Sequence, residues 1–221
     1  DIAIAVRYLQ RQHGFRRIAV IDVDGHHADG TQEIFYRERA VLTISLHRYG
    51  AYFYPGTGWY TEIGAGDGKG YSVNIPFYFP TTEESYLYAF KEIVPPLIRS
   101  YKPEIIFLQY GADSHWNDPL VGLPLTTRGY EELARMVHLL SHEVSSGKLV
   151  VTGGGGYRPE NVERIWTIGF IVISGAPISE DALKELHDKA GPERGGVDSQ
   201  VIELVKNVKK AVFPYHGLPV D

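Results

Sequence analysis

Three short apolar runs, each followed at once by polar or glycine-rich sequence, constrain the fold of this chain most strongly. They cover residues 18–23, 105–108 and 148–152. Continuous apolar runs of this length are typical of parallel strands that are buried on both faces and joined by helical crossovers. The sequence therefore predicts an α/β fold, with an open, mostly parallel sheet flanked by helices.

Side chains able to do chemistry follow all three runs. Asp22, Asp24 and His26 end the first run, Asp113 follows the second, and a Gly-Gly-Gly-Gly-Tyr turn ending at Tyr157 follows the third. Ligands bind outside the carboxyl ends of strands in open α/β sheets, so we expect these residues to face one crevice. If extended geometry persists beyond the first strand, Asp22, Asp24 and His26 project to the same side.

Two carboxylates and an imidazole are a ligand set that suits a divalent transition metal. Asp24 and His26 supply two such groups from one segment, and Asp113 supplies the third from another strand end. Zinc fits this mixture first, and Fe²⁺ is an alternative. The competing interpretation is that these are ordinary N-cap and turn carboxylates without a metal.

Three motifs together resemble the zinc-dependent histone deacetylase superfamily, which includes acetoin-utilisation proteins and acetylpolyamine amidohydrolases. They are DVDGHHADGTQ at residues 22–32, LQYGADSHWNDPL at 108–120 and GGGGY at 153–157. The resemblance runs from about Ile2 to about Gly175. It implies an arginase/deacetylase-like fold and a metal-dependent hydrolase that removes the acetyl group from an acetylated lysine or polyamine, with Asp24, His26 and Asp113 as the zinc ligands.

The resemblance also assigns roles around the metal. Tyr157 donates its hydroxyl to the oxyanion that develops on attack, although a core tyrosine after a loop is the simpler alternative. Tyr54 stands where the family usually has a phenylalanine of the substrate tunnel, and Gly155 is assigned to the same tunnel. Asp22 and Asp29 match positions whose carboxylates orient the histidines of an N-terminal family segment, and Asp22 also matches a potassium site together with Ser45 and Leu46.

One family element has no match in this sequence. Family members carry an N-terminal Gly-x-His-His segment, whose histidines serve as general base and electrostatic partner. We therefore expect a chain that lacks the N-terminal strands and obtains that segment in cis or in trans. The alternative is a non-catalytic metal-binding module, because general bases contribute about 10²–10⁴-fold to rate. A ureohydrolase is disfavoured, because that class bridges two metals with more Asp and His ligands.

Length and composition limit the number of domains and the kinds of partner that this chain can have. With 221 residues and 43% hydrophobic content, the chain predicts one domain, in which residues 176–221 form a C-terminal helical part beyond the resemblance. A net charge of -5 gives no electrostatic case for nucleic-acid binding, and the absence of cysteine excludes disulfides and thiolate metal sites. No run is long enough to span a bilayer and no signal peptide is visible, so the sequence predicts a cytoplasmic protein without a membrane partner.

The remaining pattern predicts several more elements. The paired prolines Pro95 and Pro96 should end or kink a helix that begins at a capping box of Thr81 and Glu84. His138 and His142 form an i,i+4 pair, which we interpret as a solvated or half-buried helix face rather than a metal site. Other helices are expected at residues 2–13, 31–37, 130–144, 159–166, 181–188 and 201–212, and other strands at residues 41–46, 71–76 and 170–173.

Overall fold

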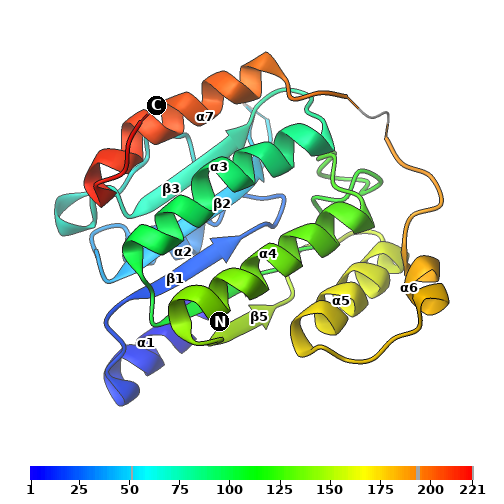
Figure 1. The fold of residues 1–221 in the computed structure, drawn as a ribbon. Coiled ribbons are helices and arrows are strands. Elements are labelled where there is room, and N and C mark those ends of the chain that lie inside the picture. The colour runs from blue at the N-terminus through cyan, green and yellow to red at the C-terminus, as the bar shows by residue number, and fades with distance from the viewer. Residues whose placement is uncertain (51, 193–194, 221) are drawn as a thin grey trace.

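The chain forms a five-stranded parallel sheet with helices on both faces (Figure 1). The computed structural model describes residues 1–50, 52–192 and 195–220. In the described chain the strand order is β3-β2-β1-β4-β5, and every neighbouring pair is parallel. The strands are β1 (Ile18–Asp22), β2 (Val41–Arg48), β3 (Ser72–Phe77), β4 (Ile105–Gln109) and β5 (Leu149–Thr152). The predicted α/β fold with a parallel sheet is confirmed.

Helices connect the strands and cover the sheet. They are α1 (Ile2–His13), α2 (Asp29–Phe35), α3 (Glu83–Tyr101), α4 (Thr127–Ser145), α5 (Pro159–Ser174), α6 (Glu180–Leu186) and α7 (Ser199–Val212), with short 3-10 turns η1 (Gly66–Gly68) and η2 (Phe213–His216). Among the described residues, no helix is both long and apolar enough to cross a membrane.

Alternation along the central strand divides the core into two clusters. Ala19 and Ile21 of β1 join the larger cluster, which contains the buried sides of α3, α4 and α7. Ile18 and Val20 point the other way and pack with α1 and Phe35 of α2. Since successive side chains of a strand point to opposite faces, β1 is apolar throughout because both of its faces are covered.

The prediction of a strand at residues 170–173 is wrong, because these residues belong to α5. Of the two outcomes predicted at Pro95 and Pro96, α3 does not end there but continues to Tyr101. The N-cap of α3 is Thr82, one residue after the predicted Thr81, and its hydroxyl accepts the backbone N–H of Ser85 at 3.2 Å.

The C-terminal helical part packs on the main core. Val201, Leu204, Val205, Val208 and Val212 of α7 lie in the same cluster as the buried residues of α3. Where α7 begins, the Asp198 backbone N–H donates to Ser85 Oγ at 2.9 Å, and that hydroxyl donates back to the Asp198 carboxylate at 3.0 Å. Residues 199–212 are therefore integrated with the sheet.

A buried ionic network joins the segment after α6 to the segment after β4. His115 Nδ1 accepts from Asn161 Nδ2 at 3.0 Å, so Nε2 carries the proton and donates to Asp188 Oδ2 at 2.9 Å. Arg164 lies 2.9 Å from Oδ1 of the same carboxylate, and the Thr127 N–H donates to Oδ2 at 2.8 Å. Burial alone would raise the pKa of Asp188, but these hydrogen bonds outweigh burial and hold the pKa well below its usual range.

We expect Asp188→Asn to lower the free energy of unfolding by roughly 3 kcal/mol at pH 7, because it leaves Arg164 beside a neutral group. Since the folded-state pKa is lowered, the carboxylate's contribution is complete above its unfolded pKa of about 3.9 and is lost as pH falls towards the folded value. Urea denaturation at pH 7 and pH 3 measures both effects, and the difference from the wild type should shrink at pH 3.

The matched control is Asp181→Asn on α6. Asp181 is almost fully exposed, and its carboxylate lies 3.4 Å from the Lys184 ammonium. An ion pair that is exposed to solvent in this way contributes little to stability. Equal destabilisation by the two substitutions would mean that the Asp188 network does not stabilise the fold.

Candidate metal centre

The backbone bends directly after β1, so the condition under which Asp22, Asp24 and His26 would project to one side is not met. Asp22 ends the strand, and its Oδ1 accepts the N–H of Asp24 at 3.0 Å. The Asp24 carboxylate in turn accepts the N–H of His26 at 2.9 Å. This turn brings the side chains of Asp24 and His26 together and leaves Asp22 behind them in the sheet.

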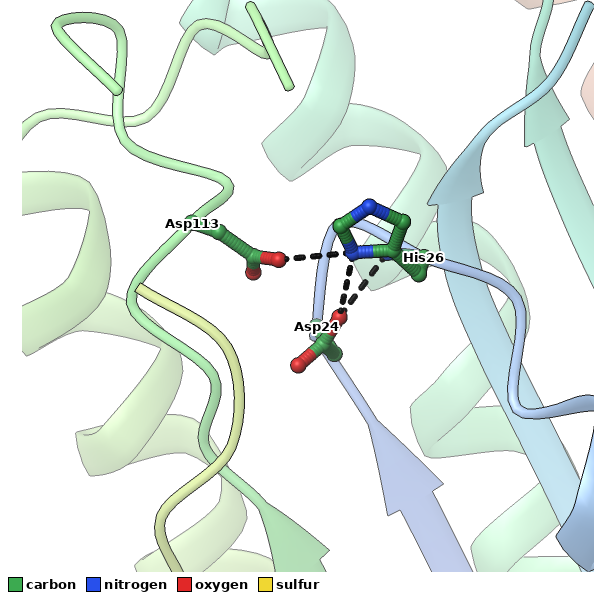
Figure 2. A group of neighbouring side chains, drawn as sticks. All are labelled: Asp24, His26 and Asp113. Atoms are coloured by element: carbon green, nitrogen blue, oxygen red, sulfur yellow. Dashed lines mark hydrogen bonds and ion pairs between the residues drawn. The ribbon is translucent and has the colours of Figure 1, made fainter. Parts of the chain in front are cut away.

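Figure 2 shows Asp24, His26 and Asp113 gathered at the carboxyl ends of β1 and β4. His26 Nδ1 lies 2.9 Å from Asp113 Oδ2 and 3.2 Å from Asp24 Oδ1. One ligand atom from each residue lies within 4.8 Å of the others, and this is the only group of its kind in the part of the chain that the structure describes. The three predicted ligands are therefore brought together, because β1 and β4 are parallel neighbours.

Backbone N–H groups orient both carboxylates. Gly25 donates to Asp113 Oδ1 at 2.7 Å, and Gly155 donates to Asp24 Oδ2 at 2.6 Å. The remaining oxygen of each carboxylate faces the imidazole nitrogen. The inner oxygens, of which Asp24 Oδ1 also accepts the His26 N–H, lie together with His26 Nδ1 as three potential metal ligands.

The protonation states of the cluster depend on burial and proximity. Burial raises the pKa of Asp113, which is completely enclosed, and the nearby Asp24 adds to that rise. Hydrogen bonds to Asp113 and then to Asp24 raise the pKa of His26 to about 9. Burial would raise the pKa of Asp24, but hydrogen bonds from His26 and Gly155 lower it. These buried groups are the kind of donor set that a divalent cation neutralises.

The glycine run after β5 brings Tyr157 to the edge of this cluster. A Cβ on Gly155 would lie 2.3 Å from Asp113 Oδ2, so only glycine allows the backbone this close. The structure thus places Gly155, predicted as a tunnel residue, against the carboxylates. The Tyr157 ring meets the His26 ring edge-on at 5.9 Å, and its side chain is 46% exposed. Burial and then Asp113 and Asp24 raise the pKa of Tyr157, so its hydroxyl stays protonated at neutral pH.

Two aromatic side chains from the loop after β2 border His26. Tyr54, the predicted tunnel residue, is 72% exposed with its ring centroid 6.2 Å from that of His26. Phe53 lies closer, stacked at 5.1 Å with an interplanar angle of 11°, and Arg48 covers it at 4.9 Å. Phe53 was not predicted as a site residue, because two adjacent aromatic residues give no signal in the sequence as to which one turns inward.

The remaining predicted residues divide into two groups. Asp22 and Ser45 are partners across β1 and β2, and both are buried, as is Leu46. Burial, followed by repulsion from Asp24, raises the pKa of Asp22. Asp29, in contrast, is exposed at the start of α2 and lines a different hollow, beside His27 and Glu62.

The i,i+4 histidine pair on α4 lies outside this centre. The rings of His138 and His142 are 4.6 Å apart, His142 is exposed and His138 is half-buried. Within the described residues the pair is not part of any group of three potential ligands.

Asp118, which was not predicted as a functional residue, holds the Tyr157 segment in place. Its buried carboxylate accepts three backbone N–H groups, from Tyr157 at 2.9 Å, Leu120 at 2.9 Å and Val121 at 3.2 Å. The Asp-Pro dipeptide at 118–119 is a turn signal that could have indicated this role.

We expect Asp118→Ala to lower the free energy of unfolding by about 2 kcal/mol, because three N–H groups lose their acceptor. The stoichiometry of bound metal should be unchanged, since Asp118 contacts none of the three clustered residues. Urea denaturation and metal analysis measure the two quantities. Asp67→Ala, at an exposed position of η1, is the control and should change neither. Loss of metal in the Asp118 variant would contradict the separation of the two roles.

Comparison with known proteins identifies the family. The sequence profile of the histone deacetylase domain matches residues 1–173. A probable deacetylase of Archaeoglobus fulgidus is 43% identical over 185 residues, which cover 84% of this chain and 50% of that protein. The acetoin utilization protein AcuC of Bacillus subtilis is 41% identical over 171 residues, covering 75% and 44%. The chain thus spans about half the length of these curated relatives.

Solved structures agree with this match. An HDAC homolog from Aquifex aeolicus superimposes with a TM-score of 0.81 at 31% identity, over 94% of this chain and 61% of that one. The HDA15 HD domain gives the same TM-score at 28% identity, over 97% and 55%. The sequence match, the fold and the motif order agree, and the chain belongs to the histone deacetylase domain family.

Proposed function

We propose that this chain carries the active site of a zinc-dependent deacetylase, which hydrolyses the acetyl amide of an acetylated lysine or polyamine. The observation that carries the proposal is the buried Asp24–His26–Asp113 cluster with the Tyr157 ring at its edge. Membership of a deacetylase family supports the reaction type. We further propose that residues 1–221 act as one deacetylase-like domain, since α7 packs on the same core as α3.

The donor set supports a divalent cation. Two buried carboxylates carry two negative charges when ionised, and a divalent ion balances them without further protein charge. Three protein ligands leave coordination free for water and substrate, which is typical of catalytic zinc sites. Fe²⁺ accepts the same oxygen and imidazole ligands and is the alternative metal.

The side chains around the cluster fit the chemistry of amide hydrolysis. A bound zinc ion would lower the pKa of a coordinated water and polarise the substrate carbonyl. The protonated Tyr157 hydroxyl would donate a hydrogen bond to the oxygen that gains negative charge. The exposed Tyr54 ring would contact the alkyl stem of a lysine or polyamine, while Phe53, stacked between His26 and Arg48, would support the imidazole.

We also propose a supporting role for the residues behind the cluster. Asp22, Ser45 and the backbone near Leu46 offer hard oxygen atoms at adjacent positions of β1 and β2, which suits a potassium ion. The carboxylate of Asp22 also accepts the Asp24 N–H, so an ion there would help fix the turn that carries two proposed zinc ligands.

The test measures deacetylation by this chain and by the complete product of its gene, on an acetyl-lysine peptide and on an acetylated polyamine. Turnover that a chelator removes and added zinc restores would support the proposal, and the preferred substrate would identify the natural class. Stoichiometric zinc without turnover by the complete product would instead favour a non-catalytic metal-binding module. Failure to bind zinc or iron would contradict both.

A further inference from the structure

A separate hollow lies at the amino ends of β1 and β2, whereas the proposed metal ligands lie at the carboxyl ends of the strands. Arg16 and Arg17 directly precede β1, and Arg39 precedes the neighbouring strand β2. These arginines and the tyrosines around them line a hollow of about 470 Å³, here called the arginine hollow. The five residues of β1 separate it from Asp24 by roughly 16 Å. In Figure 1 the C-terminal turn, in red, lies on the same side of the molecule as the start of β1.

The arginine hollow concentrates positive charge in a chain whose net charge is -5. Carboxylates pair with Arg7, Arg99, Arg135 and Arg164 elsewhere, but within the described residues none lies within 4.0 Å of the three guanidinium groups here. Arg17 Nε donates to the backbone carbonyl of Lys102 at 2.9 Å. The exposed guanidinium groups are therefore available to an anion from solution.

One carboxylate lies near this charge. Glu104 accepts the backbone N–H groups of Arg16 and Arg17 at 2.6 and 2.8 Å, and both arginines help to lower its pKa. Lys69, whose ammonium lies 5.9 Å from the Tyr215 ring, adds another positive charge beside the hollow. The three arginines and Lys69 carry four positive charges against the one negative charge of Glu104, so the net charge around the hollow is +3. This charge favours a ligand with two or more negative charges.

The walls of the arginine hollow are fixed by packing. The Tyr71 ring lies between Tyr101 at 5.8 Å and His216 at 4.9 Å. His216 Nε2 donates to the Gly70 carbonyl at 2.8 Å, and the Ser100 hydroxyl donates to the His216 carbonyl at 2.6 Å. Tyr215 packs so closely on Gly70 that a Cβ there would lie 2.4 Å from the Tyr215 side chain. The C-terminal turn therefore holds one side of the hollow in a defined shape.

We propose that the arginine hollow binds the phosphate group of a small phosphorylated ligand. Guanidinium groups match the oxygens of phosphate in geometry and charge. The volume falls within the range of about 300–1,000 Å³ found for small-molecule sites. Tyr215 is 43% exposed and offers a ring on which a planar base can stack, so a nucleotide would gain contacts that free phosphate lacks. The site is separate from the metal centre, and the proposal stands independently of the deacetylase function.

Thermal unfolding of the 221-residue chain in a phosphate-free buffer of low salt tests this, with inorganic phosphate, AMP and adenosine as probes. We expect AMP to raise the Tm by about 3–6 °C when it is present at roughly ten times its Kd. A similar rise with inorganic phosphate at equal concentration would identify free phosphate as sufficient, whereas a rise with AMP alone would identify a nucleotide. A rise with adenosine equal to that with AMP would overturn the assignment of a phosphate site.

The variant Arg16→Gln/Arg39→Gln should abolish the rise while leaving the Tm without ligand nearly unchanged, because both side chains are exposed. Arg11→Gln/Arg37→Gln removes the same charge from exposed positions outside the hollow and should respond like the wild type. No rise with either anion, or an equal rise in the Arg16/Arg39 variant, would refute the proposal. Neither readout depends on zinc or on deacetylation.

Discussion

Replacing Asp113 with alanine is expected to reduce bound zinc from one ion per chain to nearly none. Asp113 is completely buried with its Oδ2 2.9 Å from His26 Nδ1, and it completes the one group of three potential ligands found among the described residues. The substitution leaves two protein ligands and removes one of the two charges that balance the cation. Loss of groups that merely orient a zinc ligand costs about 10–100-fold in affinity, and loss of a ligand itself should cost more than 100-fold.

Metal analysis after dialysis and competition with a chromophoric chelator measure this loss. Asp29→Ala is the matched control, since Asp29 belongs to the same motif but is exposed and lies apart from the cluster. The control should keep its zinc. An Asp113→Ala chain that binds one zinc ion with unchanged affinity would show that the metal is held elsewhere.

Substituting Tyr157 with phenylalanine is expected to lower kcat for deacetylation by about 10²–10³-fold, the usual cost of losing one donor to a developing oxyanion. The ring keeps its edge-on contact with His26 at 5.9 Å, and the three proposed ligands are untouched. Zinc binding should therefore stay the same, and KM should change far less than kcat.

Steady-state kinetics on the complete gene product, with an acetyl-lysine peptide, measure this effect. Tyr52→Phe removes the same hydroxyl from a fully exposed ring in the loop after β2 and serves as the control. A Tyr157→Phe enzyme with the wild-type kcat would mean that Tyr157 contributes packing and not a hydrogen bond.

The proximity of the three proposed metal ligands was predictable because it depends on sheet topology more than on side-chain detail. Buried parallel strands are recognisable as short apolar runs, and their carboxyl ends meet at one edge. Asp24, His26 and Asp113 therefore come together once β1 and β4 are neighbours. The turn at Asp24 was not predictable from strand alternation, because it depends on hydrogen bonds between the carboxylates of Asp22 and Asp24 and the following N–H groups.

The C-terminal part of α5 shows where prediction of secondary structure from local sequence pattern fails. Residues 171–173 are Ile-Val-Ile, a β-branched run that is typical of a strand. They continue α5 because the helix buries Ile165, Ile168 and Gly169, and Gly169 approaches the Tyr110 ring so closely that a Cβ there would lie 2.7 Å from it. Tertiary packing of this kind outweighs propensity and leaves no signal within the segment itself.

The same reasoning applies to α3. Pro95 and Pro96 remove hydrogen bonds from the helix interior, and such prolines usually break a helix. Here Val94, Leu97 and Ile98 on either side of them are completely buried, so burial holds the helix through the prolines. The sequence shows the two prolines that weaken the helix, but it does not show how deeply the side chains around them are buried.

The four glycines before Tyr157 have a consequence for tracing the descent of such proteins. A Cβ at each would strike a different neighbour, Trp166 at 2.6 Å, Gln109 at 2.4 Å, Asp113 at 2.3 Å and Val162 at 2.5 Å. A Cβ on Gly154 would also lie 2.8 Å from Asp24, so Gly154 and Gly155 approach proposed zinc ligands, whereas Gly153 and Gly156 approach only other side chains. A lineage that lost catalysis but kept this fold would have to retain most of the run, while Tyr157 would be free to drift. In surveys of related genomes, the glycines would therefore report shared shape, and under the proposed role of Tyr157 the tyrosine after them would distinguish working enzymes from pseudoenzymes.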